Sequence, residues 1–168
     1  MTPVNKKNYT TTIILTKIVA ILAGYLEYYY IWVNSLPARE IQTPAVGFLL
    51  SYQIIAVIPI IALISFQPLI NEVINHRNQF KARTTLPIGV ASLLLGIMTQ
   101  DATWFAFRAI APSVGDPLAY NWIRPNDYTA QALGYAPIFG LIIPIWYFIF
   151  APAIIAIIAA LFIVPETK

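Results

Sequence analysis

Long uninterrupted stretches of apolar residues constrain this chain more than any other feature. A helix needs about 20 apolar residues to cross the hydrocarbon core of a bilayer, which is about 30 Å thick. Stretches of this length run from Thr11 to Val33, from Ala45 to Ile70, from Leu86 to Ile110 and from Ile138 to Val164. Ile, Leu, Ala and Phe occur nearly all the way round each stretch, as in helices surrounded by lipid. The sequence therefore predicts an all-α fold, a bundle of four transmembrane helices.

The composition extends this interpretation to the whole chain of 168 residues. Hydrophobic residues make up 59% and charged residues only 10%, and the mean hydropathy is +0.71. Soluble domains carry about 25% charged residues, so this chain has too few to cover the surface of a soluble globule. We expect residues 1–168 to form a single integral membrane domain with bound lipid.

The positions of the cations predict the orientation, because Lys and Arg are retained on the cytoplasmic side of a membrane. Lys6 and Lys7 precede the first span, and Arg77, Lys81 and Arg83 lie between the second and third. Cations on the other side are interspersed with acidic residues. We therefore expect a multi-pass protein of the plasma membrane with both termini in the cytoplasm. The net charge of +3 is spread without a basic run, which does not indicate a nucleic-acid partner.

The content of metal-liganding residues limits the chemistry of the chain. It contains no cysteine and a single histidine, His76. Disulfides, iron–sulfur clusters, cysteine nucleophiles and sites that need several histidines cannot be built from these residues alone. We expect no cofactor of its own, no metal site and no catalytic residue, and we expect a non-enzymatic protein.

The connection between the third and fourth spans, Ala111 to Pro137, is much longer than the few residues that usually link packed helices. Its aromatic side chains predict a structured outer loop, and Asn126 or Asp127 is expected to cap a short helix over Thr129 to Leu133. The loop could lie on the membrane surface or dock a partner subunit, and the two interpretations are compatible. Candidate docking residues are of the types enriched in interfaces, namely Tyr120, Trp122, Arg124 and Tyr128.

A few polar residues lie inside the predicted spans, where a charge costs several kcal/mol. We expect an intramembrane polar cluster near the outer side, formed by Glu27, Gln53, Asp101 and Arg108. One interpretation is structural: the arginine neutralises one of the two carboxylates, and the glutamine completes the hydrogen bonds. A proton or cation relay, or a polar passage, is a second. A third is a carboxylate metal site whose histidines come from another chain.

The segment Gln100-Asp101-Ala102-Thr103-Trp104-Phe105, near the outer end of a span and followed by a long aromatic connection, resembles small multispan archaeal membrane proteins. Some of these are similar to accessory subunits of the archaeal ammonia monooxygenase, a copper-dependent membrane complex. The resemblance implies a non-catalytic subunit bound beside copper-bearing partner subunits, with the metal ligands in those partners.

We therefore hypothesise a non-catalytic subunit of a larger membrane complex, of the monooxygenase or respiratory type, that provides assembly, stability and a polar passage. A rival hypothesis is a small transporter or channel that uses Glu27, Asp101 and a fourth helix broken by Pro144 and Pro152. An intramembrane enzyme is a third hypothesis, although no residue pattern identifies its substrate.

Overall fold

The computed structural model describes residues 6–32, 56–75, 82–116 and 118–163, and the chain is mainly helical. Its helices are α1 (Lys6–Leu26), the π-helical turn η1 (Glu27–Trp32), α3 (Ile58–Ser65), α4 (Gln67–Asn75), α5 (Ala82–Ile110), α6 (Tyr128–Leu133) and α7 (Ile145–Ile163). Strands β1 (Tyr135–Ile138) and β2 (Leu141–Pro144) form a hairpin. The fold is thus helical as predicted, with one small sheet that was not.

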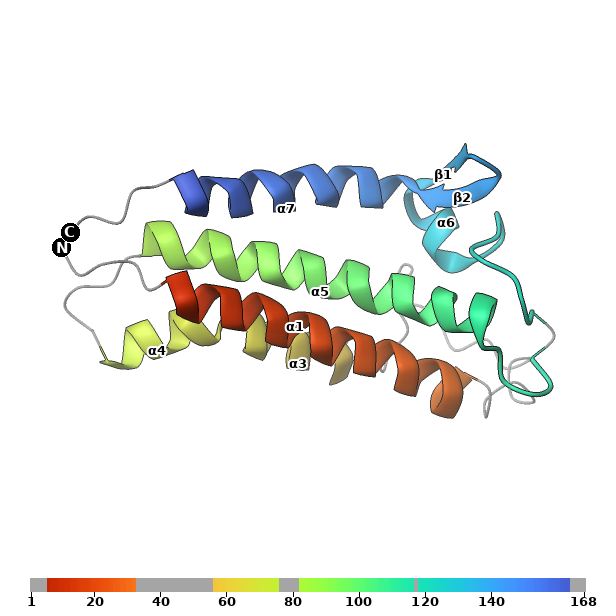
Figure 1. The fold of residues 1–168 in the computed structure, drawn as a ribbon, viewed down its shortest axis with the longest axis horizontal. Coiled ribbons are helices and arrows are strands. Elements are labelled where there is room, and N and C mark those ends of the chain that lie inside the picture. Colours follow the sequence, from red (N-terminus) through yellow and green to blue (C-terminus); the bar gives the residue numbers. More distant parts are fainter. Residues whose placement is uncertain (1–5, 33–55, 76–81, 117, 164–168) are drawn as a thin grey trace.

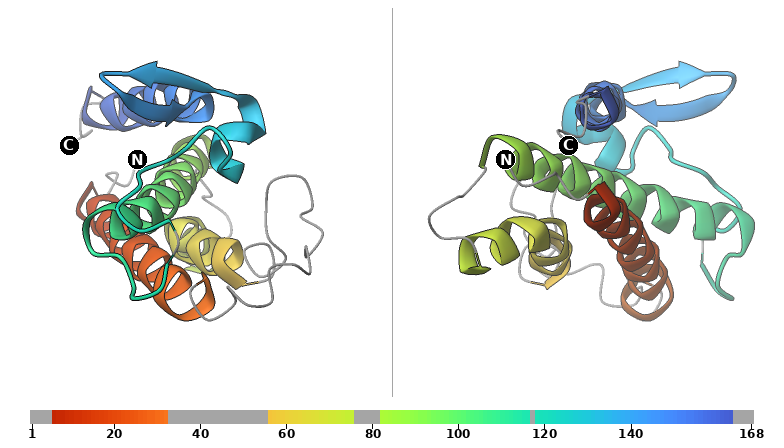
Figure 2. Two further views of the ribbon diagram at one scale, coloured as in Figure 1. Left: turned by 90° about the vertical axis from the view of Figure 1, so that its right-hand side faces the viewer. Right: turned by 60° about the vertical axis from the view of Figure 1, so that its left-hand side comes forward.

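Helix α5 is the centre of the bundle (Figure 1). It packs against α1, α3, α4 and α7. Figure 2 shows α7 on one side of α5, with α1, α3 and α4 on the other side. Helix α1 begins and α7 ends at the same end of the bundle, whereas α6 and the hairpin lie at the opposite end (Figure 1).

Within the described residues, two helices are long and apolar enough to cross a membrane, so two of the four predicted spans appear as clear membrane-length helices. The two helices are Tyr9–Tyr30, with a hydropathy of 1.5, and Thr85–Ile110, with a hydropathy of 1.2. They correspond to the first and third predicted spans. A shorter apolar helix covers Ile145–Ala159.

The predicted span from Ala45 to Ile70 does not form one continuous helix in its described part. Residues 33–55, which include the first eleven positions of this stretch, lie outside the described residues. The remainder is divided at Phe66 into α3 and α4. Pro68 explains the division, because a proline lacks the backbone N–H for an intrahelical bond and its ring clashes with the carbonyl four residues earlier.

The predicted span from Ile138 to Val164 begins as a β-hairpin and becomes helical only at Ile145. Strand β1 pairs antiparallel with β2, and Ile138 faces Leu141 across the turn. The two turn residues have positive φ, 49° at Phe139 and 80° at Gly140, which is typical of the two-residue turns that join hairpins. This geometry and the following Pro144 prevent the helix from starting earlier.

Small residues let α1 and α5 approach closely. Thr16, Ala20 and Gly24 recur at four-residue intervals and are buried. A methyl group added at Gly24 would lie 2.7 Å from the backbone oxygen of Gln100. Such contact between helices, made possible by small residues, is the usual source of helix association inside membranes.

Replacing Gly24 with alanine should separate α1 from α5, because the backbone oxygen that the new methyl group meets cannot move aside like a flexible side chain. We expect Gly24→Ala to destabilise the fold by about 1–3 kcal/mol. Thermal unfolding of the detergent-solubilised protein, followed by circular dichroism, measures the effect. Leu22→Ala is the control, because Leu22 lies on the exposed face of the same helix, and an equal loss in both variants contradicts the assignment.

Candidate functional site

The segment that follows α5 forms a structured cap over one end of the bundle. We call residues 111–144 the cap; it contains α6 and the hairpin, and Figure 1 shows it at the end opposite the start of α1. The predicted short helix is confirmed: α6 begins at Tyr128 with Asp127 at its N-cap position, but the Asp127 side chain forms no capping hydrogen bond. The backbone oxygen of Asp127 accepts hydrogen bonds from the N–H groups of Ala130 and Gln131.

Arg108, near the end of α5, is the main attachment point of the cap. Its side chain is completely buried and forms an ion pair with Asp127, with 2.7 Å between Nη2 and Oδ2. The same guanidinium donates to the backbone oxygens of Asn121 at 2.9 Å and Trp122 at 2.5 Å. Arg108 thus uses several of its donors to hold two separate parts of the cap.

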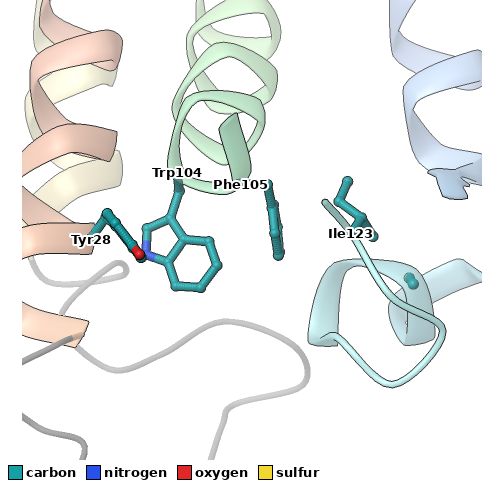
Figure 3. Close-up of a cluster of buried hydrophobic side chains, with 5 residues drawn as sticks. Tyr28, Trp104, Phe105 and Ile123 are labelled. Atoms are coloured by element: carbon teal, nitrogen blue, oxygen red, sulfur yellow. The ribbon is translucent and has the colours of Figure 1, made fainter. Parts of the chain in front are cut away.

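Aromatic rings surround this guanidinium and form the core of the junction. The Arg108 Cζ atom lies 5.3 Å from the ring centroid of Trp104 and 4.8 Å from that of Phe105. Figure 3 shows Trp104 between Tyr28 and Phe105, with Ile123 approaching from the cap. The ring centroid of Trp104 lies 5.5 Å from that of Tyr28 and 4.6 Å from that of Phe105. Burial and cation–π attraction therefore reinforce the ion pair.

Asp101 is the second attachment point, two helical turns before Arg108. Its side chain is 4% exposed and accepts three hydrogen bonds. The hydroxyl groups that donate belong to Tyr128 at 2.7 Å, Thr129 at 2.9 Å and Tyr147 at 2.6 Å. Asp101 thereby joins α5 to α6 and to the first turn of α7. Among the described residues, no lysine or arginine forms an ion pair with it.

The end of α1 holds the beginning of the cap through two tyrosines. Tyr28 donates from its hydroxyl group to Asp116 at 2.7 Å and accepts from the backbone N–H of Ser113 at 3.2 Å. Tyr29 donates to the backbone oxygen of Ala111. Sequence reasoning did not identify Tyr28 or Asp116 as a pair, because 88 positions separate them. The available signal was the acidic residue Asp116 within a loop rich in apolar and aromatic residues.

Among the described members of the predicted polar cluster, Glu27, Asp101 and Arg108 form no hydrogen bond or ion pair with one another. Glu27 is 2% exposed and accepts a hydrogen bond from Gln100, a residue of α5 that the sequence analysis did not assign to the cluster. Arg108 does not neutralise Asp101 or Glu27, contrary to the structural interpretation, and pairs with Asp127 of the cap instead. Seven residues separate Asp101 from Arg108, about 10 Å along a helix axis, so each reaches different partners. Gln53 lies outside the described residues.

The four predicted docking residues divide into two groups. Tyr120 is 77% exposed, and the side chain of Arg124 is 40% exposed. Trp122 instead donates to the backbone oxygen of Ile142 in the hairpin at 3.2 Å, and Tyr128 donates to Asp101. Trp122 and Tyr128 therefore stabilise the cap itself. Two apolar side chains that the sequence analysis did not select, Val114 and Phe139, are fully exposed on the cap.

A cavity of about 160 Å³ lies beneath the cap, and the sequence did not predict it. Helix α5 contributes Ile97 and Asp101 to its lining, and α6 contributes Ala132. Trp146 of α7 and Ile61 of α3 also line it. Within the described ranges, the cavity included, no group of three His, Asp or Glu residues is placed to hold a metal ion.

Comparison with known proteins identifies no relative of this chain. No family model, curated protein or solved structure matches it. The resemblance to accessory subunits of the archaeal ammonia monooxygenase therefore stays a prediction, and function has to be argued from the geometry of the cap.

The two arginines that contact Asp127 allow a matched test of the attachment. Arg108→Gln should loosen the cap, since breaking a buried ion pair costs about 3–5 kcal/mol. Arg124→Gln should cost less than about 1 kcal/mol, because Arg124 is partly exposed and lies 3.8 Å from the same carboxylate. Hydrogen–deuterium exchange of residues 118–134 measures the difference. Equal protection of this segment in both variants contradicts the role of Arg108.

Proposed function

We propose that this chain is a non-catalytic integral membrane subunit whose cap docks other membrane subunits on the outer side of the plasma membrane. One observation carries the proposal: the inward-facing polar groups of the cap are bound by the chain itself, while apolar side chains at its tips are exposed. A cap that folds on its own bundle and leaves apolar tips free is suited to assembly with other subunits.

The membrane location is supported by the outer surfaces of the helices. Exposed apolar side chains occur on α1, α3 and α7, for example Leu22, Leu63 and Ile155. Helix α7 carries no charged residue, and its 19 residues extend about 28 Å, close to the thickness of the hydrocarbon core. We propose α7 and the stretch 45–70 as the remaining spans, with both termini in the cytoplasm.

The tips of the cap are the proposed docking surface. Val114 and Phe139 are fully exposed and Tyr120 is 77% exposed. Tyr120 also has a positive φ of 63°, a conformation that is unfavourable for a bulky residue. Strained backbone that the surrounding structure maintains is commonly found at functional sites. Large exposed aromatic side chains are also the usual anchors of protein interfaces.

The partners that we propose are subunits of a copper monooxygenase similar to the ammonia monooxygenase, or of a respiratory complex. In the first case copper is held by the partner subunits and this chain contributes assembly and stability. The support is the segment Gln100–Phe105, whose members Asp101 and Trp104 lie at the junction that holds the cap.

Photo-cross-linking tests the docking surface directly. A photoreactive phenylalanine analogue at Phe139 or Tyr120 should give a discrete protein adduct in native membranes, because these side chains point away from the chain's own core. The same analogue at Ile155, 65% exposed on α7, is the matched control and should label lipid. Absence of a protein adduct from both cap positions contradicts the proposal.

A transporter or channel is the second candidate function, and the position of Asp101 favours it. This carboxylate borders the cavity and has no described cationic partner. A buried carboxylate beside a cavity is a common component of ion and proton pathways. Against this role, the three hydroxyl donors already occupy most of the positions at which its oxygens accept hydrogen bonds.

Replacing Asp101 with asparagine distinguishes the two functions. An asparagine whose amide nitrogen replaces Oδ1 keeps the oxygen that accepts from Thr129 and Tyr147, and the hydroxyl group of Tyr128 can rotate to accept from the amide, so the cap should stay ordered. The subunit proposal predicts that Asp101→Asn still associates with partners and that neither protein conducts ions in reconstituted vesicles. Flux through the parent protein that this substitution abolishes contradicts the subunit proposal and supports a transporter.

A further inference from the structure

We propose that the cavity beneath the cap binds the acyl chain of a bilayer lipid. This binding site is separate from the docking surface, and its occupant comes from the membrane. The inference depends on the proposed membrane location, but not on the identity or existence of a partner subunit.

Four helices contribute side chains to the cavity. Ile97 and Asp101 come from α5, Ala132 from α6, Ile61 from α3 and Phe150 from α7. Figure 2 shows α3 and α7 on different sides of α5. The cavity is partly open, and both of these helices expose apolar side chains, including Leu63 and Ile149. The surfaces of the helices that line the cavity are therefore suited to lipid.

The chemistry of the lining selects hydrocarbon. The surface of its walls is almost entirely apolar and includes Ile61, Ile97, Ala132, Trp146 and Phe150, whereas the polar lining residues Gln100, Asp101, Tyr128 and Thr129 contribute little of that surface. Asp101 lies at the border, but Tyr128, Thr129 and Tyr147 occupy most of its acceptor positions and leave little for a polar ligand. A water molecule needs two to four polar partners to occupy a buried site, so a cavity of this kind stays dry. Hydrocarbon is the ligand that such walls bind.

Size and depth agree with part of a lipid chain. The volume of about 160 Å³ resembles that of an engineered apolar cavity of about 150 Å³ that binds benzene, so a segment of about six carbons fits. Asp101 precedes the end of α5, Ile110, by nine residues, or about 14 Å along the axis. In the proposed membrane orientation, this depth lies within the hydrocarbon core. An acyl chain is the abundant apolar molecule at that depth.

Trp146 provides a spectroscopic probe, because it lines the cavity and is only 8% exposed. The protein is reconstituted in phosphatidylcholine vesicles whose acyl chains carry bromine, which quenches tryptophan fluorescence on contact. Trp146→Phe identifies the share of the emission that belongs to this residue. We expect brominated chains to quench that share, since a chain segment in the cavity touches the indole ring.

Filling the cavity should abolish this quenching. Ala132→Phe places a ring inside the cavity, and Gln131→Phe adds the same ring to the exposed side of the same helix. We expect the Trp146 share to escape quenching in the first variant and to remain quenched in the second. Ala132→Leu repeats the test with a smaller side chain if the phenylalanine variant loses its helical circular dichroism.

Three results overturn the proposal, and they differ in meaning. Equal quenching in the variants Ala132→Phe and Gln131→Phe shows that lipid reaches Trp146 from outside the cavity. Quenching by free bromobenzene but not by brominated chains assigns the cavity to small dissolved molecules. Protein that fails to float with the vesicles refutes the membrane location itself, and the lipid assignment with it.

Discussion

Burial of Arg108 and Asp101 is the constraint on which the rest of the structure depends. In a medium of low dielectric constant, an unpaired charge is costly, so each side chain has to find partners within reach. Arg108 finds Asp127 and two backbone carbonyl groups, and Asp101 finds three hydroxyl groups. Every one of these partners lies in the cap or at the start of α7. Pairing these two residues of α5 therefore determines where the polypeptide after α5 folds.

The contacts of Arg108 and Asp101 also affect the surface of the cap and the cavity beneath it. Because the cap is held by Trp104, Phe105 and the paired side chains around them, its tips are presented in fixed positions. Asp101 holds α6 onto α5, and the cavity beneath α6 is lined by residues of α3, α5 and α7. The proposed docking surface and the proposed lipid site are thus two results of one packing arrangement.

The sequence predicted the long apolar helices and the cap helix but not the pairing of buried charges. Helices α1 and α5 follow from the length of their apolar stretches, and α6 follows from the capping position of Asp127. The hairpin was missed because a short apolar run rich in Ile fits a buried strand and a helix equally well. The partner of Arg108 was missed because Asp127 lies 19 positions away in an irregular segment, and only the folded cap brings it close. Pro68 indicated the break at Phe66, but the length of the apolar stretch favoured one continuous helix.

The composition of the assembly extracted from native membranes tests the account most directly. Native mass spectrometry after gentle solubilisation reports the mass of each complex that contains this chain. The account predicts a complex in which the chain is bound to at least one other membrane protein at fixed stoichiometry. Recovery of the chain only as a monomer, or only with copies of itself, would contradict the account.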